Sequence, residues 1–122
     1  MAYLVVIKTA YDTAPREAEA APDRLIEGAP RFKTWDIDRA LNEAGHYGDV
    51  RTGLWEATPG TTRSIKGESF EFCHVLSGRC EISEEGGETH RFGPGDSFVL
   101  KPGFRGLWKT LETMRKIFVI AS

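Results

Sequence analysis

Turn signals made of glycine and proline recur along much of this sequence and divide it into short segments. The clearest are Gly93-Pro94-Gly95-Asp96 and Lys101-Pro102-Gly103, which enclose the β-prone residues 97–100. Short runs rich in β-branched and aromatic residues, separated by such turns at intervals of about ten residues, are typical of antiparallel sandwiches and small barrels. The sequence therefore predicts an all-β fold with almost no helix.

The segments expected to form strands are either continuously β-prone or alternate apolar and polar side chains. They are residues 3–8, 32–37, 53–57, 70–76, 89–92, 97–100, 106–109 and 115–120. Residues 13–23 contain two prolines and predict a loose linker, and residues 61–68 predict a polar connection. Asp38 as a cap and Gly45 as a stop predict a short helix over residues 38–44.

Residues 70–78 place a carboxylate inside a predicted strand. Ser77-Gly78 is a two-residue turn signal, so this run predicts a hairpin that continues into residues 80–82. Because side chains alternate along a strand, Glu71 shares one face with Cys73, while His74 points to the other face. An ionisable group is therefore expected among apolar ones.

Length and charge limit the possible classes of function. A chain of 122 residues fits one domain with a single core. The net charge of −2, with basic and acidic residues interspersed, predicts binding neither to nucleic acid nor to a membrane. No apolar run reaches the length of a transmembrane span, and the first residues lack the basic start of a signal peptide, so a cytoplasmic location is predicted.

The two cysteines are expected to be unbridged. If Ser77-Gly78 forms a turn, Cys80 lies opposite Val75 and not opposite Cys73, which disfavours a disulfide. Cys73 also has no base on its own face, because His74 points away, so a nucleophilic role is not expected. We predict that Cys73 is a small core residue bordering the ligand.

Two blocks of the sequence resemble the conserved motifs of the cupin family. Glu71 followed by Val75-Leu76-Ser77-Gly78 is similar to the first motif, and Gly95-Asp96 leading to Pro102-Gly103 is similar to the second. The resemblance implies a double-stranded β-helix, the jelly-roll barrel of RmlC-like cupins. More narrowly, the chain resembles small single-domain cupins related to the ureidoglycine aminohydrolase cupin domain and the ethanolamine-utilisation cupin. Residues 22–30, 53–60, 71–74, 103–108 and 115–116 carry this narrower resemblance.

The metal ligands that the resemblance implies are mostly missing. In a typical metal-binding cupin two histidines precede the glutamate and a third follows Pro-Gly, and these places fall within residues 64–67 and on Gly106. None is a histidine, and the remaining Glu71 alone does not make a catalytic metal site. The histidines present, His46, His74 and His90, are not expected to converge. We predict no metal and no other cofactor, and a weakly bound divalent ion is the one alternative left open.

Two roles for Glu71 remain open. In the functional role its carboxylate points into the barrel mouth, where an apolar setting raises its pKa and prepares it for proton transfer. In the structural role it forms a buried ion pair with a basic residue such as Arg63, Lys101 or Lys116. Lys116 shares a strand face with Phe118, so it is expected to point inward and to need Glu71 as its partner.

Trp55 and Trp108 also allow two interpretations, because indole rings either fill a core or flank a small-molecule cavity. The candidate site has Glu71 and Lys116 as catalytic residues. Its ligand-binding residues are Trp55, Arg63, Cys73, Lys101 and Trp108. Lys66, in contrast, is expected on a solvated loop with no function.

The sequence thus predicts a small-molecule-binding cupin whose substrate it does not name. One alternative is a metal-independent enzyme acting on a small nitrogen-containing or carboxylated metabolite, and the other is a non-catalytic binding or structural accessory protein. Residues 1–21 are expected to form an N-terminal strand and linker, and residues 22–122 the cupin domain. Because a loose segment follows the first strand, that strand can pair with a second subunit, and a homodimer is predicted.

Overall fold

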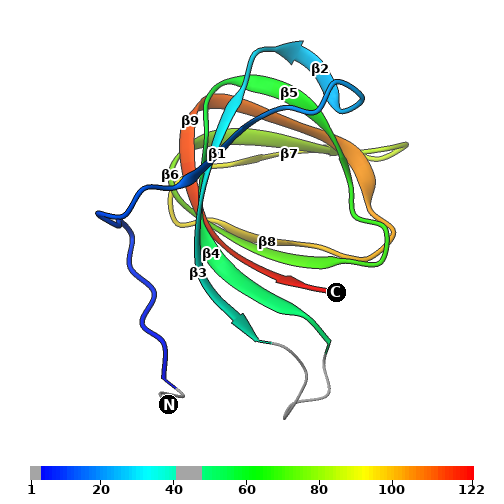
Figure 1. The fold of residues 1–122 in the computed structure, drawn as a ribbon. Coiled ribbons are helices and arrows are strands. Elements are labelled where there is room, and N and C mark those ends of the chain that lie inside the picture. Colours follow the sequence, from blue (N-terminus) through cyan, green and yellow to red (C-terminus); the bar gives the residue numbers. More distant parts are fainter. Residues whose placement is uncertain (1–3, 41–47) are drawn as a thin grey trace.

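A computed structural model describes residues 4–40 and 48–122, and this part of the chain consists of nine strands without a helix. The all-β prediction is therefore confirmed. In chain order the strands are β1 (Arg16–Glu19), β2 (Leu25–Gly28), β3 (Arg31–Ala40), β4 (Val50–Ala57), β5 (Gly60–Ile65), β6 (Phe70–Glu84), β7 (Thr89–Phe92), β8 (Ser97–Leu100) and β9 (Arg105–Ala121) (Figure 1).

Two long strands, β6 and β9, belong to both sheets of a sandwich. Residues 114–121 of β9 pair with β4, whereas residues 105–110 pair with β5. In the same way, the first half of β6 pairs with β8 and its second half with β7. One sheet has the order β1-β3-β4-β9-β6-β8 and the other β2-β5-β9-β6-β7, all antiparallel. Figure 1 shows the two sheets curled around a common interior.

β6 passes from one sheet to the other at Gly78. The register against β9 shifts on both sides of this residue, which has a φ of 77°. A Cβ atom at Gly78 would collide with the carbonyl oxygen of Thr113 and with Met114. Ser77-Gly78 is thus a bulged bend within one strand, and the predicted hairpin turn is wrong. A strand that belongs to two sheets needs extra twist where it passes between them, and a bulge with a glycine provides it.

The cysteines are both buried and free, so the prediction of unbridged thiols is confirmed. The pairing used to reach it is wrong, because Cys80 lies opposite Phe92 and Thr110, not opposite Val75. The alternation predicted along β6 is confirmed. Cys73 and Val75 are buried together with Glu71 on one face.

Several local predictions fail where pairing overrides the local sequence signal. Residues 4–15 form no strand, so the strand predicted over residues 3–8 is wrong in its described part. The linker 13–23 contains β1, and the connection 61–68 contains most of β5, whose β-branched threonines suit a half-buried strand. The helix over residues 38–44 is wrong for residues 38–40, which extend the ladder of β3 with β4; residues 41–44 lie outside the described residues. The two runs 106–109 and 115–120 are parts of one strand, β9.

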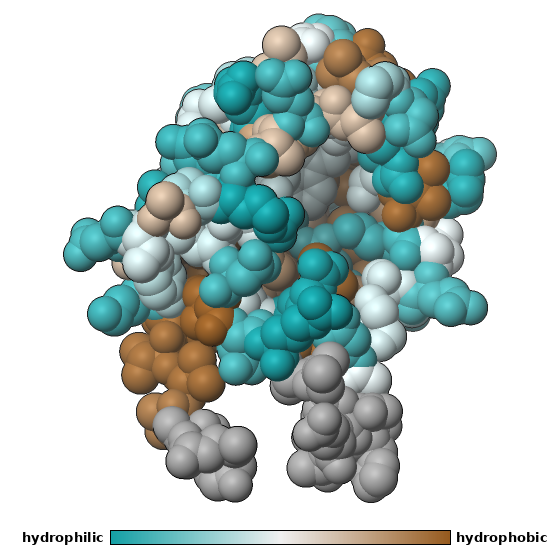
Figure 2. All heavy atoms as spheres, viewed as in Figure 1, coloured by the Kyte–Doolittle hydropathy of each residue, from teal (hydrophilic) through white to brown (hydrophobic). Residues whose placement is uncertain are grey.

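The hydrophobic core lies between the sheets and includes Val75, Ile82, Leu100, Trp108 and Met114. Outside it, apolar side chains gather on the N-terminal segment, where Leu4 is 79% and Val6 64% exposed (Figure 2). A search of residues 4–40 and 48–122 finds no helix with the length and hydropathy of a membrane span.

Candidate ligand-binding site

A buried ion pair joins the two long strands. Lys116 of β9 stands directly between Trp55 of β4 and Val75 of β6 in the sheet, so its side chain shares their inward face. Its Nζ atom donates to Oε2 of Glu71 at 2.6 Å. Glu71 is 3% and Lys116 5% exposed. The predicted contact between these two residues is therefore confirmed.

A second ammonium group, that of Lys66, reaches the same carboxylate. Lys66 follows β5, its backbone N–H donates to the carbonyl oxygen of Phe104, and its Nζ atom pairs with Oε1 of Glu71. Its side chain is only 17% exposed, so its predicted place on a solvated loop is wrong. The sequence did contain a signal, because residues 64–67 are where the cupin resemblance places two inward-pointing histidines.

Aromatic rings and a thiol complete the surroundings of Lys116. Its Nζ atom lies 4.3 Å from the ring centroid of Trp55 and 4.3 Å from that of Trp108, a distance at which an ammonium is attracted to a ring face. The thiol of Cys73 donates to Oε2 of Glu71 at 3.2 Å and lies 3.6 Å from Nζ of Lys116. Two carboxylate oxygens, two ammonium groups and one thiol thus form a single cluster.

The charges in this cluster stabilise one another. Burial by itself would raise the pKa of Glu71, but Lys116 and Lys66 outweigh it and lower that pKa to about 2. Burial would lower the pKa of Lys116, but Cys73 and Glu71 more than offset this and the pKa is raised. Burial raises the pKa of the Cys73 thiol to about 12. The predicted increase in the pKa of Glu71 is wrong, because two ammonium groups are in contact with its oxygens.

A cavity of about 250 Å³ opens above the cluster. Of the predicted site residues, Glu71, Lys116, Trp55, Trp108 and Arg63 line it. The guanidinium of Arg63 also donates to the carbonyl oxygen of Asp23 at 3.1 Å. Cys73 contacts the cluster from behind and does not line the cavity.

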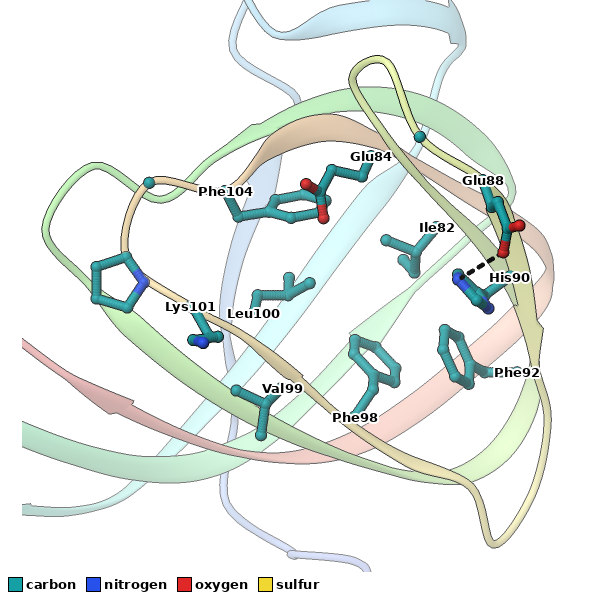
Figure 3. A pocket seen from close by; sticks show the side chains of 13 residues that line it. Ile82, Glu84, Glu88, His90, Phe92, Phe98, Val99, Leu100, Lys101 and Phe104 are labelled. Atoms are coloured by element: carbon teal, nitrogen blue, oxygen red, sulfur yellow. Dashed lines mark ion pairs between the residues drawn. The ribbon is translucent and has the colours of Figure 1, made fainter.

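Lys101 is not part of this arrangement. It lines a separate cavity of about 730 Å³, which opens between the edge strands β7 and β8 (Figure 3). That cavity is walled by Ile82, Leu100 and three phenylalanines, with Glu84, Glu88 and His90 among its polar residues. As a partner for Glu71, Lys101 is therefore a wrong prediction. The smaller cavity is the better candidate, because it has buried charges at its base.

The sequence interpretation missed several residues of the smaller cavity. Phe32 stacks on Trp55 with ring centroids 5.5 Å apart, and three arginines from separate segments reach the lining: Arg16, Arg24 and Arg51. No local pattern marks these arginines. Their convergence depends on the pairing of β1 with β3, of β2 with β5, and of β3 with β4.

The residues at the cluster do not fit the metal of a typical cupin. Both oxygens of Glu71 already accept hydrogen bonds from ammonium groups. At Gly106, where the third histidine would stand, a Cβ atom would collide with the carbonyl oxygen of Ser83. Across the described parts of the chain no three His, Cys, Asp or Glu side chains are placed to hold a metal ion. The predicted lack of a metal or other cofactor stays a prediction.

Comparison with solved structures shows the fold. A DUF861-family protein of unknown function from Pseudomonas syringae pv. tomato superposes with a TM-score of 0.78 and 19% identity over 93% of this chain and 46% of its own. The EutQ protein of Clostridium difficile gives 0.62 and 18% over 75% of this chain and 63% of its own. Ectoine synthase from P. lautus gives 0.63 and 17% over 84% and 67%. The chain thus spans about half the length of the Pseudomonas protein.

No curated protein matches the sequence. Residues 44–118, more than half of the chain, match the EutQ-like cupin domain. Together with the jelly-roll arrangement of its strands, this match shows that the chain belongs to the EutQ-like cupin domain family.

Proposed function

We propose that the protein binds a small metabolite in the cavity above Glu71, Lys116 and Lys66. The observation that supports this best is a cluster of buried charges at the base of an open cavity flanked by two indole rings. Ligand sites are usually concave and largely apolar, with a few convergent polar groups. Buried ion pairs are often no more stable than apolar residues of the same size. The stability of the fold alone therefore does not explain why charged groups lie at this cavity.

Binding is the primary proposal, and catalysis by Glu71 and Lys116 is secondary. Efficient general acids and bases have pKa values near the working pH. The pKa of Glu71 is lowered to about 2 and that of Lys116 is raised, so neither group is prepared to exchange a proton at neutral pH in the free protein. A non-catalytic binding or accessory role agrees better with this geometry.

The enzymatic alternative rests on the likeness to other proteins. Ectoine synthase has the same fold, so the fold is compatible with catalysis. The sequence also resembles the ureidoglycine aminohydrolase cupin domain, which favours a nitrogen-containing or carboxylated metabolite. In this alternative Glu71 and Lys116 change protonation only when the ligand alters their surroundings.

A thermal-shift screen tests the binding function. A metabolite library containing acids, amines and neutral ureides is expected to yield ligands that raise the Tm, because a ligand that binds only the folded state stabilises it. Thr34 lines the cavity, so Thr34→Phe should abolish the shift by filling the space. Thr89→Phe is the matched control, because Thr89 is exposed on β7 outside this cavity.

Two results would contradict the binding function. One is a library without any ligand, and the other is a Tm increase that Thr34→Phe leaves unchanged. For every ligand found, turnover is then measured with the wild type and with Glu71→Gln. Ligands that bind without turnover would establish the non-catalytic role.

A further inference from the structure

The charged side chains around the smaller cavity are mostly of one sign. Six of the residues lining it are cationic: Arg16, Arg24, Arg51, Arg63, Lys66 and Lys116. Among the described residues Glu71 is the one anionic side chain of the lining. The whole chain, in contrast, has a net charge of −2, so this positive excess is local to the cavity.

The base of the cavity offers donors and no free acceptor charge. Both oxygens of Glu71 are paired, Oε1 with Lys66 and Oε2 with Lys116. An amine or guanidine entering the cavity would have to compete with ammonium groups already in place. A carboxylate or phosphate meets the remaining N–H donors of Lys66, since an ammonium has three and the ion pair with Glu71 uses one.

Two arginines in the wall of the cavity have no side-chain partner among the described residues. Arg16 is engaged by Asp36 at 3.3 Å and Arg63 by a backbone carbonyl. Arg24 and Arg51 are half-buried, and within residues 4–40 and 48–122 neither side chain makes a hydrogen bond or an ion pair. A guanidinium presents N–H donors in a planar fork that matches the two oxygens of a carboxylate or phosphate. A half-buried pair of such forks beside a cavity is suited to an anion.

We propose that the ligand of this cavity is a small anion, a carboxylate or phosphate compound, bound by Arg24 and Arg51 with its other end against Trp55 and Lys66. This inference rests on the proposed binding function and narrows it. The volume of about 250 Å³ equals the space of roughly eight water molecules, so a compound with a short chain of about four carbons is the expected size.

Isosteric probes of different charge test the inference by calorimetry and thermal shift. Succinate is the dianion, succinamide the neutral compound of equal length, and 1,4-diaminobutane the dication. Glycerol 3-phosphate, compared with glycerol, separates phosphate from carboxylate recognition. We expect at least one of the two anions to bind, the neutral and cationic probes to show no shift, and the affinity for the anion to fall as salt is added.

Variants then locate the anion. Arg24→Gln and Arg51→Gln should each weaken binding of that anion about tenfold or more, because each removes a charge-assisted hydrogen bond. Arg51→Lys, which keeps the charge, should restore part of the affinity. Arg79→Gln is the matched control, because Arg79 is exposed, pairs with Glu112 and lies outside this cavity.

Three results would overturn the inference: tighter or equal binding of succinamide or diaminobutane, unchanged anion affinity in both arginine variants, or no binding of either anion. These outcomes are separable from failure of the binding function. A neutral or cationic library ligand whose binding Thr34→Phe blocks would refute anion recognition but support the binding function. A library without ligands would refute both.

Discussion

Glu71 is surrounded by groups that hold it ionised in a place where an isolated carboxylate would be neutral. Burial and opposite charge act in opposite directions on its pKa, and the two ammonium groups prevail. The same contacts fix the rotamers of Lys66 and Lys116, so the ion cluster gives the base of the cavity a defined shape. The stability of the fold is therefore sensitive to any change that removes one charge of the cluster.

Acid should remove this stabilisation in a defined pH range. The pKa of Glu71 is about 2 in the folded protein against 4.5 for an unperturbed glutamate, so between pH 4.5 and 2 the unfolded chain binds more protons. The contribution of Glu71 is complete above pH 4.5 and is lost as the pH falls toward 2, with a size on the order of 3 kcal/mol. Urea unfolding at pH 7, 4 and 3 measures it.

Glu71→Gln serves as the reference in that experiment, because the other carboxylates titrate equally in both proteins. The wild type should lose more free energy of unfolding between pH 7 and pH 3 than the variant. Equal losses in the two proteins would show that the ion cluster has no effect on the pKa of Glu71.

Removing one member of the cluster should cost more than removing two. Glu71→Gln leaves two ammonium groups near the core without a counter-charge, and a loss of about 3–5 kcal/mol is expected from broken buried pairs. Glu71→Leu combined with Lys116→Met should recover part of this loss, because it leaves one ammonium group, the less buried Lys66, without a counter-charge instead of two. Chemical denaturation at pH 7 gives the three free energies.

The surface pair of Arg79 and Glu112 provides the control for this cycle. Both side chains are exposed, and Glu112→Gln should change the free energy of unfolding by less than about 1 kcal/mol. If the double variant is as unstable as Glu71→Gln alone, the number of unpaired charges does not set the loss of stability.

At the level of the strands, the bend of β6 depends on a residue without a side chain. Gly78→Ala should destabilise the fold by about 1–3 kcal/mol or more, because the added Cβ meets the backbone at Thr113 while φ is positive. Gly86→Ala is the matched control: its φ is also positive, at 74°, but no atom lies within 4 Å of the added Cβ. It should cost about 1 kcal/mol, because an L-residue in the left-handed conformation brings its Cβ close to the following carbonyl oxygen.

A comparison of thermal unfolding of the two variants measures the difference. If Gly86→Ala proves as destabilising as Gly78→Ala, then only the backbone conformation matters, and the close packing at the bend has no energetic role.

The sequence predicted most of the segments that are strands, but it did not predict which segments join into one long strand. The segments 89–92 and 97–100 lie between strong turn residues, and the structure has strands over the same residues as β7 and β8. β6 and β9 contain residues that locally favour a turn, and only their pairing with strands of both sheets keeps them extended. The segment 61–68 failed for a related reason, because threonine is polar and also β-prone.

The site residues that could be predicted are those whose side-chain direction follows from the alternation of side chains along a strand. Glu71, Cys73 and Lys116 follow from the inward face of two strands, and the structure brings these three together. Lys101 failed because the buried Leu100 is the residue opposite Glu71, which leaves the next residue, Lys101, exposed beside the other cavity. Lys66 was missed because its environment is set by a chain reversal after β5. The arginines of the cavity come from segments far apart in sequence, which no local pattern links.

On the scale of the whole molecule, the N-terminal segment is apolar and pairs with no strand among the described residues. Leu4, Val5, Val6 and Ile7 are exposed, and they extend away from the sandwich (Figures 1 and 2). Within the described residues they pair with no strand. We expect this segment to add to a free sheet edge of a second copy, since such edges have unpaired backbone groups. The homodimer stays a prediction on this ground.

Light scattering after size exclusion checks the dimer. The wild type should have twice the mass of one chain at micromolar concentration, and Leu4→Asp combined with Val6→Asp should reduce it to one. Leu25→Asp, a change at an exposed residue of β2, should leave the mass unchanged. A wild type of single-chain mass would exclude the exchange of this segment.

The central position of β9 also bears on how the protein is made in the cell. β4, β5 and β6 all pair with β9, and the ribosome synthesises all three before it. Until residues 105–121 have left the exit tunnel, neither sheet has its middle strand, and three strand edges stay exposed. The nascent chain therefore cannot fold progressively from its N-terminus. We expect aggregation to be the main risk until β9 has emerged, after which both sheets can close together.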